Sequence, residues 1–251
     1  MTPRPSFTKV WALGLAFAAG LGLVGCAGSP SPPGFLSAAQ TAMARGSQAY
    51  LEGDSRRSTI EYQRAVQLLS QTGRADLIAK AVLTECAAKV TGLDFEPCAG
   101  FNRLDQDARP SDRAYASLLN GELRANDVDK LPENHRRLGL AIVQLQALKN
   151  AAQVEEASLP AILAEGLAAA ESQQGPFSQL LALALLRHYG WPDGLLWSSA
   201  LEKAERQGWR RPLLAWIEVG VQEKSRSGDV ITRERLLRQG QRILDSSPRV
   251  R

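Results

Sequence analysis

Histidine and cysteine are scarce in this chain, which has two histidines and three cysteines among 251 residues. His135 and His188 lie far apart in the sequence, and neither has a cysteine or another histidine at the spacing that metal ligands require. The G-x-S-x-G, P-loop, H-E-x-x-H and C-x-x-C patterns are absent as well. These absences argue against a metal site, a bound cofactor and a Ser-His or Cys-His catalytic centre.

Aromatic residues and the alternating pattern of β-strands are also sparse. Only 6% of the chain is aromatic, although 44% is hydrophobic, so a core would consist mainly of Ala, Leu, Val and Ile. Apolar residues recur with a period near 3.6 and are separated by Gly and Pro punctuation, which predicts an all-α fold. The 30 Lys+Arg against 26 Asp+Glu give a mildly basic, mixed surface that does not favour nucleic acid as a partner.

The punctuation predicts about ten helices joined by short connections, an arrangement typical of antiparallel hairpins. Residues 91–110 contain two prolines and are expected to be irregular. Ser111 is expected to cap the helix that follows this segment. The expected helices cover residues 36–51, 55–69, 76–90, 111–123, 132–153, 158–174, 176–188, 195–207, 211–224 and 229–244.

Long apolar runs are missing except for one near the N-terminus. Residues 10–25 carry no charge and follow the basic residues Arg4 and Lys9. The run is shorter than the roughly 20 residues that cross a bilayer core, and it fits the apolar region of a secretory signal peptide. The alternative is a short anchor helix, which the glycines in the run disfavour. We therefore expect residues 1–25 to be an export signal.

The end of this run is Leu23-Val24-Gly25-Cys26, which resembles the lipobox of bacterial lipoproteins. The resemblance implies cleavage before Cys26 and a covalent lipid on that cysteine, so that fatty acyl chains anchor the protein to a membrane. The residue after the cysteine is Ala27. An Asp at this position would imply that the lipoprotein stays at the inner membrane, so the alanine implies that it is anchored at the periplasmic face of the outer membrane. Residues 26–34 are rich in Pro, Ser and Gly and are expected to form a flexible tether.

Cys86 and Cys98 remain once Cys26 is assigned to the lipid. An exported protein matures in an oxidising compartment, so we expect the two to form a disulfide. The alternative is two buried free thiols.

Residues 39–72 resemble a tetratricopeptide repeat. Gly46, the turn Gly53-Asp54, Tyr62 and Ala65 stand at that family's spacings, and Ser58 occupies a position where the family usually has alanine. The last hairpin echoes the pattern only in its Gly228-Asp229 turn and Gly240, because Arg233 and Leu237 replace the alanine and the aromatic. The resemblance implies a right-handed solenoid of helix hairpins over residues 35–251, with 91–110 as an irregular insertion.

The two resemblances together imply a non-catalytic scaffold or assembly factor of the bacterial cell envelope, bound to the membrane by its lipid and to another envelope protein by a groove. By family resemblance the first hairpin would present Gln40, Met43, Ser47 and Tyr50 to that groove. A structural lipoprotein with no specific partner is the alternative within the same class.

An enzymatic alternative rests on "AESQQGPF" at residues 170–177, which resembles the Glu-Ser pair of lytic transglycosylases. Glu171 would then be the general acid that cleaves peptidoglycan, which requires a pocket that raises its pKa. Asp105, Asp107 and Asp112 suggest calcium, but the segment lacks the glycine and terminal Glu of an EF-hand loop, so a solvated loop is the preferred interpretation.

Four tryptophans lie within residues 191–216: Trp191, Trp197, Trp209 and Trp216. Trp and Arg dominate binding hot spots, so these residues can mark an interface. Alternatively, they fill gaps between hairpins in a core made of Ala and Leu.

Overall fold

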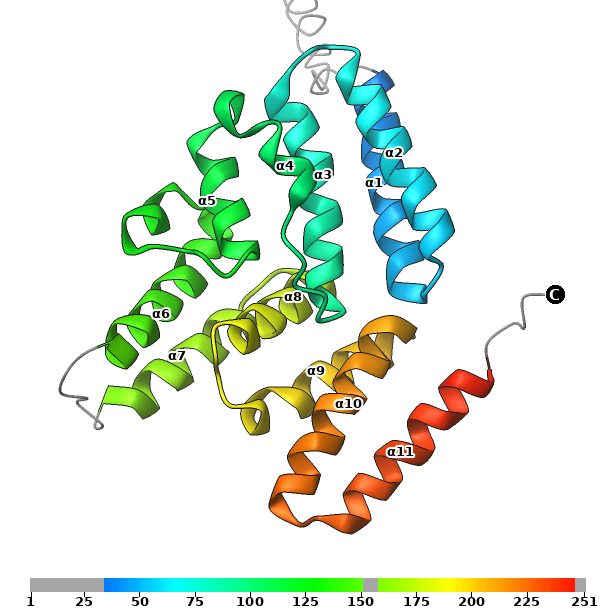
Figure 1. Ribbon diagram of the computed structural model, residues 1–251, viewed down its shortest axis with the longest axis vertical. Helices are drawn as coiled ribbons and strands as arrows, with labels where there is room; N and C mark the ends of the chain where they lie inside the picture. The colour runs from blue at the N-terminus through cyan, green and yellow to red at the C-terminus, as the bar shows by residue number, and fades with distance from the viewer. Residues whose placement is uncertain (1–33, 151–157, 247–251) are drawn as a thin grey trace, which may run out of the picture. The chain divides into compact units, whose positions relative to one another are not determined.

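The computed structural model describes residues 34–150 and 158–246, and all regular structure in these residues is helical (Figure 1). They belong to one compact unit that begins at Gly34. The predicted signal, Cys26 and all of the tether except Gly34 lie outside the described residues. The α-helices are α1 (Gly34–Glu52), α2 (Ser55–Ser70), α3 (Ala75–Thr91), α4 (Ala99–Asn102), α5 (Pro110–Leu119), α6 (Glu133–Asn150), α7 (Leu159–Glu171), α8 (Gly175–His188), α9 (Asp193–Gln207), α10 (Arg210–Ser227) and α11 (Val230–Asp245).

Each of the ten expected helices has a counterpart, so the all-α prediction is confirmed. The added elements lie in the middle of the chain: the short α4 and two 3₁₀ turns, η1 (Asp105–Asp107) and η2 (Ala125–Lys130). Ser111 does not cap α5, which starts one residue earlier with Pro110 in its first turn and Arg109 as N-cap. The helix also ends at Leu119 rather than at residue 123.

The first hairpin has the Gly-Asp turn that its sequence predicts, and its two helices pack closely. Gly53 adopts a left-handed φ of +93° in the turn, and the Asp54 carboxylate accepts a hydrogen bond of 2.9 Å from the backbone N–H of Arg57. A Cβ at Gly46 would lie 3.0 Å from the Tyr62 ring, so the glycine lets α1 and α2 approach closely. Tyr62 is only 2% exposed, and its hydroxyl shares a 2.7 Å hydrogen bond with Ser47 Oγ.

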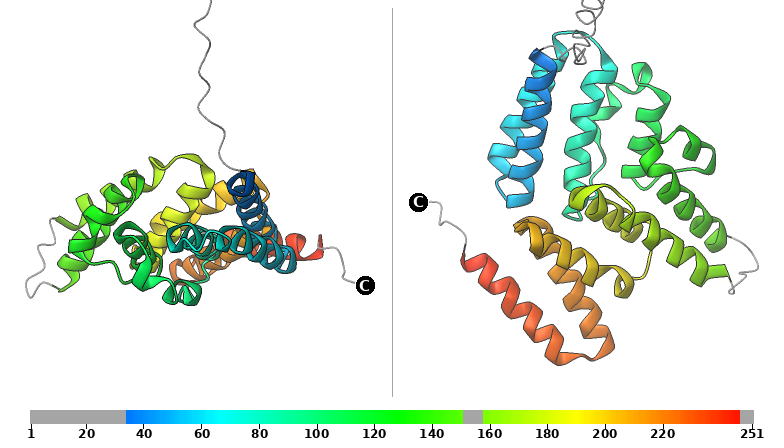
Figure 2. Two further views of the ribbon diagram at one scale, coloured as in Figure 1. Left: turned by 90° about the horizontal axis from the view of Figure 1, so that it is seen from above. Right: turned by 180° about the vertical axis from the view of Figure 1, so that it is seen from behind.

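Most helices adjacent in the sequence pack against one another, as in a helical-repeat array (Figure 2). Two further contacts join distant parts of the chain: α3 packs on α8, and α1 packs on α10. Residues 180–186 of α8 are all buried, so this helix is surrounded by protein on every side and forms the centre of the main core.

The last hairpin turns through Gly228-Asp229 with the same local chemistry as the first. Gly228 has a φ of +75°, and the Asp229 carboxylate accepts a 3.1 Å hydrogen bond from the backbone N–H of Thr232. The packing differs, because Leu237 at the aromatic position is 49% exposed. The other large apolar side chains exposed on α11 are Val230, Ile231 and Leu244.

No helix among the described residues combines the length and the apolar character needed to span a bilayer.

Candidate binding cleft

A cleft of about 530 Å³ lies between α1, α3, α5 and α8. Its apolar lining includes Met43, Leu83, Ala87, Pro132 and Phe177, contributed by elements from both halves of the chain. Volumes of about 300–1,000 Å³ with a mainly apolar lining and a few polar groups are usual for binding sites. We refer to this site as the apolar cleft.

Two aromatic side chains in the lining of the cleft are fixed from behind by other rings. Tyr115 stacks on His135 with ring centroids 4.9 Å apart, and Phe177 meets Trp209 edge to face at 6.5 Å. Burial lowers the pKa of His135 to about 4, so the imidazole is neutral at pH 7. Burial also raises the pKa of Tyr115 well above its usual range. The rings of Tyr115 and Phe177 therefore pack against His135 and Trp209, which are both uncharged at neutral pH.

The charged groups that line the cleft are Lys80, Arg109 and Asp112. Arg109 Nε donates to Asp112 Oδ2 at 3.0 Å, and these two charges compensate each other. Lys80 is exposed and has no ion-pair partner among the described residues. The cleft thus combines an apolar lining with one uncompensated positive charge.

The four residues predicted to face a partner have different surroundings. Met43 lines the cleft, and Gln40, three residues before it on α1, is exposed. Ser47 is half-buried and hydrogen-bonds to the Tyr62 hydroxyl. Tyr50 is only 7% exposed, and the Arg211 guanidinium lies 4.3 Å from its ring centroid. Met43 is therefore the predicted residue that the structure places in the cleft.

Apart from Met43, the residues that line the cleft were not predicted to do so, among them Lys80, Tyr115 and Phe177. These three residues lie on α3, α5 and α8, which are far apart in the sequence. The tetratricopeptide spacing extends only over α1 and α2, so it gave no signal for these three positions.

The four tryptophans mostly fill the core, which favours the packing interpretation. Trp191, Trp209 and Trp216 are 2%, 6% and 0% exposed. Trp191 Nε1 donates to the backbone oxygen of Leu163 at 3.3 Å. Trp197 is half-buried, with Lys224 Nζ at 5.7 Å from its ring centroid.

Glu171, the candidate general acid, lies at the C-terminal end of α7, and its side chain is 49% exposed. Its Oε2 forms a 2.8 Å ion pair with Lys203 Nζ, and its Oε1 accepts a 2.9 Å hydrogen bond from Ser199 Oγ. The Glu171 carboxylate is therefore exposed to water and engaged by two neighbouring side chains, whereas the general acid of the enzymatic alternative needs an enclosed pocket. This surrounding does not provide the pocket that the enzymatic alternative requires.

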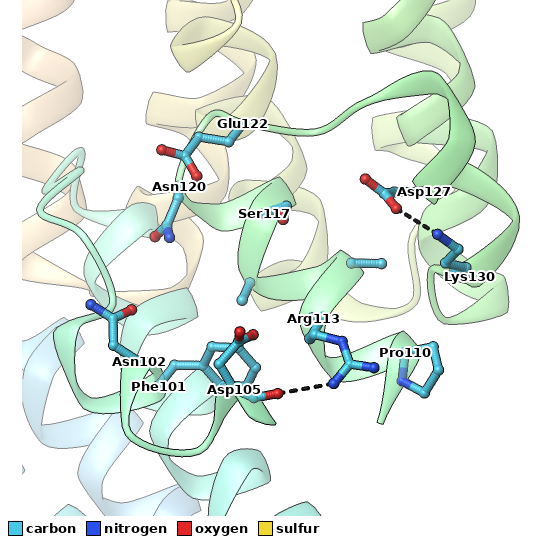
Figure 3. Close-up of a pocket in the computed structure, with 12 residues that line it drawn as sticks. Phe101, Asn102, Asp105, Pro110, Arg113, Ser117, Asn120, Glu122, Asp127 and Lys130 are labelled. Atoms are coloured by element: carbon cyan, nitrogen blue, oxygen red, sulfur yellow. Dashed lines mark hydrogen bonds and ion pairs between the residues drawn. The ribbon is translucent and has the colours of Figure 1, made fainter. Parts of the chain in front are cut away.

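The three aspartates suggested for calcium do not converge. Asp112 lines the apolar cleft and pairs with Arg109, whereas Asp105 lines a separate polar pocket of about 550 Å³ (Figure 3). In that pocket Arg113 Nη1 donates to the backbone oxygen of Asp105 at 2.9 Å. Within residues 34–150 and 158–246 no group of three His, Cys, Asp or Glu side chains is placed to hold a metal ion.

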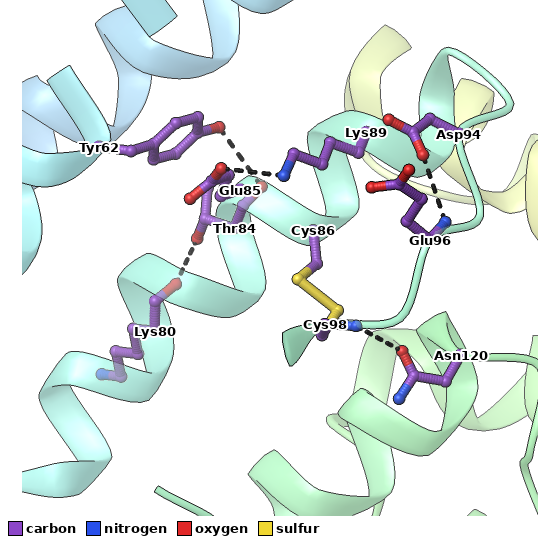
Figure 4. The surroundings of a disulfide bond; sticks show 10 residues. All are labelled: Tyr62, Lys80, Thr84, Glu85, Cys86, Lys89, Asp94, Glu96, Cys98 and Asn120. Atoms are coloured by element: carbon purple, nitrogen blue, oxygen red, sulfur yellow. Dashed lines mark hydrogen bonds and ion pairs between the residues drawn. A yellow bond between two sulfur atoms is a disulfide. The ribbon is translucent and has the colours of Figure 1, made fainter. Parts of the chain in front are cut away.

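Cys86 and Cys98 form a disulfide pair, with Cα atoms 5.8 Å apart (Figure 4). The bridge joins α3 to the residue before α4 and closes a loop of sequence separation 12. In the chain-entropy model a loop of this size contributes about 3 kcal/mol. The backbone N–H of Cys98 also donates to Asn120 Oδ1 at 3.1 Å, so this point is tied to α3 and to the end of α5.

Comparison of the chain with family models, curated proteins and solved structures yields no match.

Proposed function

We propose that the protein is a lipoprotein of the outer membrane that faces the periplasm and acts, without catalysis, as a scaffold or assembly factor for another envelope protein. The observation that supports a scaffold is the apolar cleft, which is built from four helices and lined by rings fixed from behind. The lipobox-like sequence at Cys26 supports the membrane anchor.

The proposed mechanism is docking of an apolar segment of the partner in the cleft. Burial of apolar surface favours such a complex by about 25 cal/mol per Å² of area removed from water, and the lost translational and conformational freedom of the two partners offsets a large part of this gain. The lipid on Cys26 confines the protein to the membrane, which raises its effective concentration for a partner at the same surface.

A photo-crosslinking residue placed at Met43 tests the docking site in cells. We expect one discrete envelope protein to be captured, and the same residue placed at exposed Ile60 on α2 to capture none of it. The substitution Thr84→Phe fills the cleft from α3 and should abolish the capture at Met43. Capture that is equal at both positions, or that survives Thr84→Phe, would contradict docking in the cleft.

The anchor is tested by Cys26→Ala. We expect the variant to lose its acyl chains and to leave the outer-membrane fraction. Unchanged fractionation, together with an unmodified mass for the wild-type N-terminus, would remove the lipoprotein from the proposal.

Catalysis is tested by incubating the purified protein with peptidoglycan sacculi. We expect no release of muropeptides from the wild type or from Glu171→Gln. Release by the wild type that Glu171→Gln abolishes would replace the scaffold with a peptidoglycan-cleaving enzyme.

A further inference from the structure

The polar pocket of about 550 Å³ lies on the opposite side of α5 from the apolar cleft. Arg113, Ser117 and Asn120 line the pocket and follow one another at helical spacing, whereas Ser111 and Tyr115 line the cleft. The polar pocket shares no lining residue with the cleft, so it needs an explanation of its own.

Hydrogen-bonding groups of both kinds surround this pocket (Figure 3). Asp105 and Glu122 offer carboxylate oxygens that no described side chain engages, and the Ser117 hydroxyl and Asn102 amide are likewise without a side-chain partner. Because Asn120 Oδ1 accepts from the backbone N–H of Cys98, the Asn120 amide keeps its NH₂ group as a donor. A ligand that both donates and accepts hydrogen bonds matches this set.

The pocket also has an apolar part, formed by Phe101, Pro110 and the alanines of α5. A purely polar ligand would leave this surface in contact with water, and an apolar ligand would bury the carboxylates without partners, which is costly. A sugar ring has hydroxyls at its edge and C–H groups on its faces, so it satisfies both parts at once.

The charged side chains that line the polar pocket limit which class of ligand can bind there. The Lys130 ammonium pairs with Asp127 at 2.8 Å, and Arg113 donates to the backbone oxygens of Asp105 and Ala108. The charged lining is then Asp105, Glu122 and Asp127 against Arg113 and Lys130, a net charge of −1. This balance disfavours an anionic ligand.

The pocket is held by contacts within the protein before any ligand arrives. Arg113 joins η1 to α5, and the Cys98–Asn120 hydrogen bond ties the chain beside the disulfide to the end of α5. A preformed site loses little conformational entropy on binding. We propose that this pocket binds a carbohydrate ring that carries no acidic group.

Three sugars of nearly the same size test the proposal, because they differ in charge: glucose, glucosamine and glucuronate. Saturation-transfer NMR on the purified full-length chain measures their binding. We expect glucose and glucosamine to bind with dissociation constants of about 1–10 mM. Glucuronate should bind about fivefold more weakly, because two carboxylates face the ligand. No transfer to any of the three, or tightest binding of glucuronate, would overturn the proposal.

Two variants locate the binding. Glu122→Ala should weaken glucose about fivefold through loss of a hydrogen bond to a charged group, whereas the matched control Glu133→Ala, outside the pocket, should leave it unchanged. Ser117→Phe fills the pocket and should abolish binding of all the sugars while the helical circular dichroism is retained. Binding unaffected by both pocket variants would show that the sugars bind elsewhere and would overturn the assignment. Because neither variant touches the apolar cleft, these outcomes are independent of the crosslinking test at Met43.

Discussion

The first and last hairpins use the same turn and pack differently. Each turns through a glycine in the left-handed region followed by an aspartate that caps the next helix. In the first hairpin, Tyr62 fills the space between helices and is 2% exposed, whereas Leu237 at the equivalent position in the last hairpin is 49% exposed. The turn is therefore set by two adjacent residues, while close packing depends on a third residue eight positions further along.

The largest expected difference between the hairpins comes from this third residue. Tyr62→Ala should cost about 3–5 kcal/mol, because it leaves a cavity between α1 and α2 and removes the partner of Ser47. Leu237→Ala should change the free energy of unfolding by no more than about 0.5 kcal/mol. Urea unfolding of both variants measures the difference, and equal losses would mean that the two hairpins pack alike.

The next largest loss of stability is expected at Arg211, which connects α10 of the last hairpin to the first hairpin. This residue of α10 donates from Nε to the backbone oxygen of Tyr50 at 3.0 Å and from Nη2 to Ser55 Oγ at 2.6 Å, and its guanidinium stacks on the Tyr50 ring. Arg211→Ala should cost about 2 kcal/mol and speed amide exchange in α1. The control Arg206→Ala changes an exposed residue and should have little effect on the free energy of unfolding. A loss in Arg211→Ala as small as that of the control would show that the contact contributes no stability.

The packing glycines should respond with opposite signs. A Cβ at Gly46 would meet the immobilised Tyr62 ring at 3.0 Å, so Gly46→Ala should destabilise by about 1–2 kcal/mol. A Cβ at Gly240 would lie 3.5 Å from Ile217, an ordinary contact, so Gly240→Ala should stabilise by about 0.5–1 kcal/mol through helix propensity. Thermal unfolding of the two variants measures both changes in stability. If both substitutions stabilise the protein, the steric argument at Gly46 is wrong.

The smallest difference should be between the capping aspartates, because their chemistry is shared. Asp54→Ala should cost about 1 kcal/mol at neutral pH. The hydrogen bond from the Thr232 backbone holds the pKa of Asp229 below its usual range. Its contribution to stability is therefore present above the unfolded-state pKa of about 3.9 and is lost as pH falls through the lower folded-state value.

Unfolding of the wild type and of Asp229→Ala, compared between about pH 6 and pH 2, measures this contribution. The gap between the two proteins should narrow below about pH 4. A gap that widens on acidification would contradict the assigned hydrogen bond.

The sequence predicts local features well here. The Gly-Asp turns and ten of the helices follow from residues within one or two turns of each other. The predicted start of α5 at Ser111 was wrong. Pro110 is itself a good first-turn residue, so the helix begins one residue earlier. The early end of α5 also escaped prediction. The helix ends at the C-cap Asn120, followed by Gly121 with a left-handed φ of +80°, which is a local stop signal. The segment after it is held from a distance, because the backbone N–H of Leu123 donates a 3.0 Å hydrogen bond to the Tyr189 hydroxyl, 66 residues away.

The apolar cleft was predictable only at Met43. Most of its other lining side chains come from α3, α5 and α8, and no short-range pattern reports that α3 packs on α8. The same limit applies to the tryptophans. Composition favours either an interface or a core, and only the burial of Trp191, Trp209 and Trp216 separates the two.

The contact between α1 and α10 has a consequence for how the domain unfolds. In an open array each repeat touches only its neighbours, so the ends can fray while the middle stays folded. Here Arg211 reaches back across 161 positions to Tyr50, and the beginning of the domain is completed by a helix near its end. Loss of the last helices would uncover the first, so the two ends should melt together as one cooperative unit.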